Sequence, residues 1–213
     1  MNIKAVIFDM DGLLINSEPF WDKTDRELFQ KRGYTVPSEV LVKRLGTGHK
    51  RTMEIIKEAS GVTEDTDTLI KERLVIFYGL LEKNLVLMAG AKDLIYKLTK
   101  EGKKLTIATG GHSQEKVATL LRKMEIAQYF SVIVSGDDVA RHKPFPDIFL
   151  LAAKNLQVEP GASLVLEDAP SGVQAGKAAG MTVYGVNKDV AIKERLKEAG
   201  ADKVFTSLAE VDL

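Results

Sequence analysis

The sequence predicts an α/β fold in which a doubly wound parallel sheet carries a small all-helical domain. After Gly90, short apolar runs alternate with segments of helical periodicity, which is typical of a parallel sheet with helices on both faces. Between residues 16 and 85 the apolar residues follow a helical spacing, and no run is typical of a strand. We therefore expect a core domain of residues 1–15 and 86–213, with residues 16–85 inserted after the first strand as a helical cap.

The first expected strand is the apolar run at residues 3–8, whose composition suits burial in a parallel sheet. Two amphipathic stripes near residues 20–29 and 69–81 predict helices in the cap. The stretch between them at residues 44–51 is rich in glycine and basic residues, and we interpret it as a loop. Further strands are expected at 105–109, 132–135, 164–167 and 182–184, and further helices at 91–98, 114–124, 147–157 and 170–179.

The composition argues against several classes of protein. Thirty basic residues balance thirty acidic residues in the 213-residue chain, which does not favour a nucleic-acid-binding protein. The absence of cysteine excludes disulfides, thiol nucleophiles and cysteine-ligated zinc. The longest apolar runs have about five residues, far fewer than a membrane span needs, and the first residues lack the pattern of a signal peptide. We expect a cytoplasmic monomer with neither a nucleic-acid nor a membrane partner.

Polar residues of unusual type follow the expected strands. Because the carboxyl ends of parallel strands form one edge of an open sheet, where ligands bind, we expect these side chains to converge. Two acids follow the first strand, a threonine ends the second, an acidic pair follows a later one, and a lysine lies in a loop after residues 132–135. These residues are Asp9, Asp11, Thr109, Lys143, Glu167 and Asp168.

Any single acid after a strand is commonly a turn residue or a helix N-cap. Several carboxylates in one place repel each other unless a cation or a lysine offsets their charge. An oxygen-rich cluster suits Mg²⁺, which takes a carboxylate or two together with water and phosphate oxygens. Lys143 would supply a positive charge for a phosphate, and glycines at positions 12 and 110 would let backbone N–H groups approach it.

The motifs Asp9-x-Asp11-Gly12, Thr109, Lys143-Pro144 and Glu167-Asp168 occur in the order and approximate spacing of the four motifs of the haloacid dehalogenase superfamily. The chain resembles this superfamily over essentially its whole length. The resemblance implies a Rossmann-like core with a helical cap and a Mg²⁺-dependent phosphatase activity. The segments around these motifs resemble hexose-phosphate phosphatases, pseudouridine 5′-phosphatases and β-phosphoglucomutases.

The resemblance also implies roles for individual residues. Asp9 would attack phosphorus and form an aspartyl-phosphate, and Asp11 would act as the general acid and then as the general base. Mg²⁺ would be held by the Asp9 carboxylate, the Asp11 backbone carbonyl and Asp168, with Glu167 as a ligand or behind the ligands. The phosphoryl group would be held by Thr109, Gly110 and Lys143.

Substrate recognition is expected from the cap and from one residue of the core. For several of these residues an ordinary structural role competes with substrate binding: Trp21 could pack in an apolar stripe, His49 and Lys50 could lie in a solvated loop, and His112 could lie in a surface turn. β-Phosphoglucomutases have a histidine where this chain has Trp21 and an arginine where it has His49, which counts against mutase activity. The candidates are Glu18, Trp21, Gly46, His49, Lys50 and His112.

Hydrolysis of a small phosphate monoester, such as a sugar or sugar-alcohol phosphate, is the function that these features favour. A phosphosugar mutase of the same family is the alternative. A dehalogenase would need neither an acid at Asp11 nor Mg²⁺, and an ATP-dependent kinase of the P-loop type would need a G-x-x-x-x-G-K-[ST] loop, which the sequence lacks. A non-catalytic receiver-like regulatory module would lack both the helical insertion and Asp11.

Overall fold

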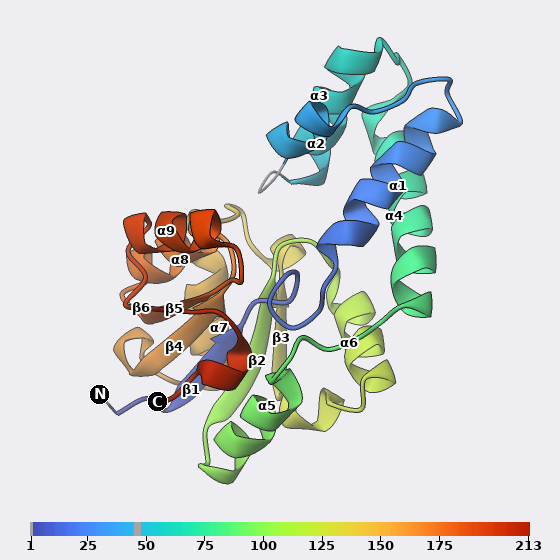
Figure 1. Cartoon of the computed structure of the whole chain (residues 1–213). Coiled ribbons are helices and arrows are strands. Elements are labelled where there is room, and N and C mark those ends of the chain that lie inside the picture. Colours follow the sequence, from blue (N-terminus) through green and yellow to red (C-terminus); the bar gives the residue numbers. More distant parts are fainter. Residues whose placement is uncertain (1, 45–47) are drawn as a thin grey trace. The chain divides into compact units, whose positions relative to one another are not determined.

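A computed structural model describes residues 2–44 and 48–213 of the chain, which divides into two compact units, Met1–Asn16 with Val86–Leu213 and Ser17–Leu85. Within the described residues the first unit, the α/β unit, contains a sheet of six parallel strands in the order β3-β2-β1-β4-β5-β6 (Figure 1). The α/β class predicted from the sequence is confirmed. The strands are β1 (Ala5–Phe8), β2 (Lys104–Thr109), β3 (Val132–Ser135), β4 (Ser163–Glu167), β5 (Thr182–Val186) and β6 (Lys203–Phe205).

Helices follow the strands in turn, as the alternating pattern predicts. The sequence analysis missed α9 and β6; β6 has only three residues, and none of its side chains is fully buried. The α-helices of this unit are α5 (Ala91–Lys100), α6 (Gln114–Lys123), α7 (Asp147–Leu156), α8 (Pro170–Ala178) and α9 (Val190–Glu198). Short 3₁₀ helices lie at η1 (Ala127–Tyr129), η2 (Gly136–Asp138), η3 (Pro160–Ala162) and η4 (Leu208–Glu210).

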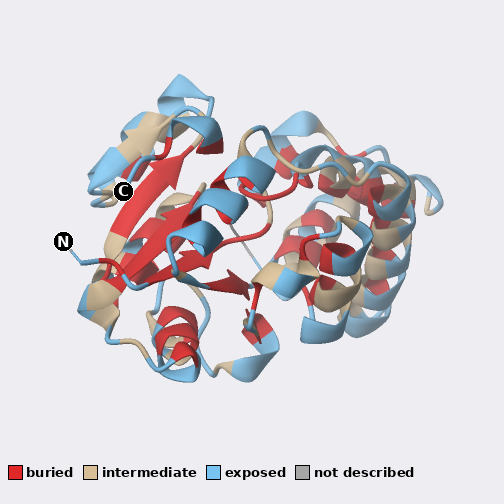
Figure 2. Ribbon diagram, turned by 90° about the horizontal axis from the view of Figure 1, so that it is seen from below, coloured by how far each residue is buried: buried red, intermediate tan, exposed pale blue. Residues whose placement is uncertain are grey.

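The sheet is buried between helices, and its strands are therefore apolar on both faces (Figure 2). One face carries Ile7, Ala108 and Val165, which pack with buried residues of α7, α8 and α9. The alternate residues of β1 point the other way, and Phe8 meets Phe130 edge to face with ring centroids 5.8 Å apart. This double coverage leaves the ends of the strands as the place where polar side chains can reach solvent.

The second unit, the helical unit, consists of α1 (Glu18–Gln30), α2 (Ser38–Lys43), α3 (His49–Ser60) and α4 (Thr66–Lys83) among the described residues. Its apolar core joins α1 to the other helices through residues such as Leu28, Phe29 and Met53. The expectation of a loop over residues 44–51 is wrong at its C-terminal end, because α3 begins at His49. Only three residues of α3 are buried, so the helical periodicity of residues 51–60 is weak in the sequence.

A buried ionic cluster links three segments of the helical unit. Asp25 of α1 is fully buried and accepts hydrogen bonds from Nε and Nη2 of Arg73 of α4, at 2.6 and 3.1 Å. Its other charged neighbour is Arg44 at the end of α2, whose Nε lies 2.9 Å from Asp25 Oδ2. Arg44 also bonds Asp22, one turn before Asp25. One buried carboxylate therefore lies between two buried guanidinium groups.

Among the helices of residues 2–44 and 48–213, none combines the length and the apolar character that crossing a membrane requires.

Candidate active site

The register of the sheet brings two of the expected residues to the same level. Phe8 pairs with Ile107 on β2 and with Leu166 on β4, so the residue after Phe8 lies beside the ends of both neighbouring strands. That residue is Asp9, whose backbone N–H donates to the Leu166 carbonyl at 3.0 Å. The parallel arrangement therefore places Asp9 next to Glu167.

The chain after Asp9 turns sharply and is anchored by apolar side chains. Met10, Leu13 and Leu14 are buried, and the Gly12 N–H donates to the Ile15 carbonyl at 2.8 Å. The burial of these side chains explains why apolar residues follow the acidic motif, because they anchor the loop to the core. The Asp11 side chain remains partly exposed on this loop.

Lys143 connects the two acids at the strand ends. Its Nζ donates to Asp9 Oδ1 and to Glu167 Oε1, both at 2.6 Å, and to the Ala108 carbonyl at 3.3 Å. An ammonium group has three donors, and these contacts use all three. Burial opposes the charge of Lys143, but the carboxylates of Asp9 and Glu167 outweigh it and raise the pKa of Lys143. The lysine is therefore a fixed positive charge.

Glu167 is held on both of its oxygens. Oε1 accepts from Lys143, and Oε2 accepts from the backbone N–H of Ala169 at 3.0 Å. A Cβ on Gly172 would lie 1.8 Å from Oε1 of this carboxylate, so only glycine fits at the start of α8. The role of Gly172 was not predicted, since a glycine near a helix start has no distinctive sequence signal. Glu167 is thus suited to orient Lys143 and to stand behind the ligands of a metal ion.

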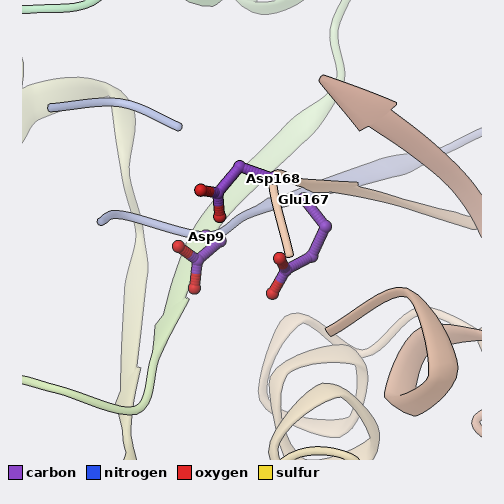
Figure 3. A group of neighbouring side chains, drawn as sticks. All are labelled: Asp9, Glu167 and Asp168. Atoms are coloured by element: carbon purple, nitrogen blue, oxygen red, sulfur yellow. The ribbon is translucent and has the colours of Figure 1, made fainter. Parts of the chain in front are cut away.

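Three carboxylates at the ends of β1 and β4 can supply metal ligands. One oxygen each of Asp9, Glu167 and Asp168 lie within 4.8 Å of one another (Figure 3). An oxygen-only donor set with a net negative charge is what a hard divalent cation such as Mg²⁺ prefers, so these residues fit the ion. Gly12 has a φ of +77°, and a Cβ there would lie 2.0 Å from Asp168 Oδ2. A side chain at this position would displace the Asp168 carboxylate.

The pKa of Asp9 is raised to about 7, chiefly because the side chain is buried. Lys143 opposes this rise, whereas the nearby carboxylates of Glu167 and Asp11 add to it. A divalent cation beside Asp9 would favour the ionised form and lower this pKa. The ionised form is also the one that can act as a nucleophile.

This pKa predicts how the stability of metal-free protein depends on pH. Asp9 loses its proton near pH 3.8 when unfolded and near pH 7 when folded, so between these values the unfolded state binds fewer protons and stability falls as pH rises. Asp9→Asn removes this effect. In EDTA, the difference in melting temperature, Asp9→Asn minus wild type, is expected to increase from pH 4 to pH 7 and then to level off. Mg²⁺ should narrow the difference at pH 7.5. A difference that is independent of pH would contradict the raised pKa.

Thr109 ends β2 and is buried beside the same strand ends. Its Oγ1 accepts a weak hydrogen bond of 3.4 Å from the Gly111 N–H. Gly110, between them, has open space around the position of a Cβ, so a ligand could approach its backbone. The structure thus places Thr109 and Gly110 at the strand-end edge that carries Asp9.

His112 does not lie in a surface turn, which was one of the two alternatives for it. It is only 3% exposed, so the interpretation as a surface turn is wrong. Its Nε2 lies 3.0 Å from the carboxylate oxygens Oδ1 and Oδ2 of Asp11. Burial lowers the pKa of His112, but the charge of Asp11 and the hydrogen bond to it raise this pKa by more. The sequence could not reveal this pairing, because the two residues are distant in the chain.

The remaining candidates belong to the helical unit. Trp21 is buried and stacks on Phe77 with ring centroids 3.4 Å apart, and the Arg73 guanidinium lies 4.2 Å from the centroid of the Trp21 ring. These contacts give Trp21 a packing role. His49 is half-buried, and its Nδ1 lies 2.8 Å from Nη1 of Arg73.

Two further candidates, Glu18 and Lys50, are exposed, whereas Gly46 lies outside the described residues. One supporting residue was not predicted: Asn187, after β5, donates from Nδ2 to the Asp168 carbonyl at 3.2 Å.

Comparison with known proteins connects this geometry to a family. A model of the haloacid dehalogenase-like hydrolases matches residues 6–186. A phosphorylated carbohydrates phosphatase from Thermotoga maritima is 32% identical over 204 residues, which are 93% of this chain and 92% of that protein. A fructose-1-phosphate phosphatase from Escherichia coli is 30% identical over 183 residues, 85% of this chain and 95% of that protein.

Among solved structures, CbbY from Rhodobacter sphaeroides in complex with phosphate superposes with a TM-score of 0.83. It is 29% identical in sequence, and the match covers 98% of this chain and 96% of that one.

Proposed function

The chain belongs to the haloacid dehalogenase-like hydrolases and is a phosphatase of phosphate monoesters; from this premise we propose that it hydrolyses a phosphorylated sugar or sugar alcohol with Mg²⁺ through an aspartyl-phosphate at Asp9. The arrangement that carries the proposal is Asp9, held by Lys143 and grouped with the carboxylates of Glu167 and Asp168. It offers a nucleophile, a fixed cation and oxygen ligands at one edge of the sheet.

In the first step an oxygen of the Asp9 carboxylate attacks phosphorus, and the bond between phosphorus and the leaving oxygen breaks. Asp11 gives its proton to that oxygen, so the alcohol departs uncharged. In the second step a water molecule attacks phosphorus and passes a proton to the Asp11 carboxylate. The bond from phosphorus to Asp9 then breaks, and inorganic phosphate leaves with both acids restored.

The other residues hold the reacting groups. Thr109 and the backbone N–H of Gly110 would bind the phosphoryl oxygens during both steps, and Lys143 would do so by exchanging its long contact with the Ala108 carbonyl for one with a phosphoryl oxygen. Mg²⁺ would be held by the Asp9 carboxylate, the Asp11 backbone carbonyl and Asp168. When bound, it would offset the negative charge that the phosphoryl group and Asp9 bring together. Glu167 would keep Lys143 in place rather than bind the ion itself.

The substrate class is the part of the proposal that relies most on the relatives, which include phosphatases of phosphorylated carbohydrates and of fructose 1-phosphate. Recognition by Glu18, Trp21, Gly46, His49, Lys50 and His112 stays a prediction, as do the monomeric state and the cytoplasmic location. β-Phosphoglucomutases have an arginine where this chain has His49. The absence of that arginine agrees with a substrate that carries a single phosphate.

A phosphate-release panel tests the proposal. Hexose phosphates, sugar-alcohol phosphates and nucleoside monophosphates are incubated with the protein in Mg²⁺ and, separately, in EDTA. Release is expected with one or more sugar or sugar-alcohol phosphates and should disappear in EDTA. Preference for nucleotides would overturn the substrate class, undiminished release in EDTA would overturn the Mg²⁺ requirement, and conversion of a hexose phosphate to an isomer without release would identify a mutase.

The covalent intermediate has a separate readout. When an alcohol acceptor such as glycerol is added, an aspartyl-phosphate divides between water and acceptor in a ratio that does not depend on the original leaving group. Two substrates with different leaving groups should therefore give the same ratio of phosphate to glycerol phosphate. Ratios that differ between substrates would indicate direct attack by water.

A further inference from the structure

The carboxylate of Asp11, the proposed acid of the reaction, is in contact with the imidazole of His112. His112 lies between β2 and α6, and its side chain is fully buried against the Asp11 carboxylate. Nε2 of His112 is 3.0 Å from Oδ1 and 3.0 Å from Oδ2, so the imidazole faces the carboxylate as a whole. Asp11 itself is 22% exposed on its loop. A partly exposed carboxylate on a short loop is thus tied to a buried ring.

The backbone on either side holds His112 in this position. Thr109 is fixed in the sheet, and Ser113 begins α6 by accepting a hydrogen bond from the Lys116 N–H at 3.4 Å. Gly111 allows the close approach, because a Cβ there would lie 3.0 Å from Asp11 Oδ2. The sequence Gly-Gly-His between a strand and a helix therefore brings the ring to Asp11 without a competing side chain.

We propose that His112 is a positioning residue that orients the Asp11 carboxyl group for proton transfer. The inference rests on the proposed function, since it takes Asp11 as the acid and base of the reaction. A proton transfer needs the carboxyl oxygen within hydrogen-bond reach of the leaving oxygen, and a misplacement of about 1 Å can cost roughly 10²-fold in rate. His112 limits the rotation of the carboxyl group to arrangements that keep the contact.

A positioning role predicts different effects on alkyl and aryl phosphates, whereas a purely structural role predicts the same effect on both. Alkyl phosphates release a strongly basic alkoxide and need the proton of Asp11, whereas p-nitrophenyl phosphate releases a stable phenolate without one. The parameter kcat/KM reports steps up to the first irreversible one, here the transfer of the phosphoryl group to Asp9. Loss of orientation at Asp11 should therefore lower kcat/KM for an alkyl phosphate and leave that for p-nitrophenyl phosphate nearly unchanged.

The experiment compares His112→Ala, His112→Gln and Ser113→Ala with wild type, using p-nitrophenyl phosphate and the best alkyl phosphate of the panel. A glutamine amide can place a donor near the position of Nε2, so it serves as the conservative replacement. Ser113→Ala weakens the start of α6 but keeps the imidazole, and it controls for a general loosening of the segment. Melting temperatures are measured for all variants.

His112→Ala is expected to lower kcat/KM for the alkyl ester by about 10- to 100-fold and for the aryl ester by less than about threefold. His112→Gln should recover most of the alkyl activity, and Ser113→Ala should affect both esters equally. Equal losses on both esters in His112→Ala, or no loss on either, would overturn the inference while leaving the phosphatase proposal intact. A wild type inactive on every ester would instead overturn the proposed function.

If His112→Ala does not fold, His112→Gln and His112→Asn carry the test. The shorter asparagine cannot reach the position of Nε2. The ratio of kcat/KM for the alkyl ester to that for the aryl ester should therefore be well below that of His112→Gln. Equal ratios for the two variants would contradict the positioning role.

Discussion

Asp9→Asn is expected to reduce Mg²⁺-dependent phosphate release by roughly 10³-fold or more, because an amide cannot act as the nucleophile. Asparagine has the shape of aspartate, and its carbonyl oxygen can still accept the hydrogen bond that Lys143 gives to Oδ1. The residues proposed to bind phosphate would therefore stay in place. The measurement is kcat on the best substrate of the panel, with the melting temperature as a check that the variant is folded.

The matched control for this variant is Asp93→Asn. Asp93 is an exposed residue in the first turn of α5, and the same substitution there removes a charge without touching the strand ends. It should retain the activity of wild type. If Asp9→Asn also retained wild-type activity, neither an aspartyl-phosphate nor any essential role of this carboxylate could stand.

The sheet was largely predictable from the sequence because its strands are buried on both faces and so appear as continuous apolar runs. The five strands from β1 to β5 carry this signal. β6 does not, since only three residues pair and Lys203 is exposed. In the helical unit, the start of α3 was hidden because His49, Lys50 and Arg51 have the composition of a loop although they form the first turn of a helix.

The candidate site residues could be placed from the sequence because each lies at or after the end of a strand, and parallel strands end at a common edge. The contacts among them could not be derived in this way. Lys143 reaches Asp9 and Glu167 through a loop whose path depends on tertiary structure. His112 was a candidate residue, but its burial was not predicted. That burial depends on Gly110 and Gly111 and on the contact with Asp11, which lies about a hundred positions earlier in the chain.

Asp25→Asn is expected to destabilise the helical unit by about 3–5 kcal/mol, because it leaves the buried guanidinium of Arg73 without a compensating charge and that of Arg44 with only partly exposed acidic partners such as Asp22. Asp25 has no exposed surface, and the guanidinium groups of Arg44 and Arg73 lie on either side of it. The only tryptophan of the chain, Trp21, stacks on Phe77 inside this unit. Urea unfolding followed by its fluorescence therefore reports on the affected segment.

Asp22→Asn provides the control on the same helix. Asp22 also contacts Arg44, but its side chain is 51% exposed, so its loss should cost less than about 1 kcal/mol. The two variants remove the same chemical group three residues apart and differ chiefly in burial. Equal destabilisation by both would mean that the buried cluster contributes no more than a surface ion pair.

A double substitution separates the cost of an unpaired charge from the loss of packing. In the wild type, Arg73→Met removes one partner and leaves Asp25 with Arg44. In the Asp25→Asn background it removes a guanidinium that is already uncompensated, so it should cost less there and could restore stability. A cost of Arg73→Met that is the same in both backgrounds would show that Asp25 and Arg73 are not coupled. The stability would then come from the packing of Arg73 over Trp21.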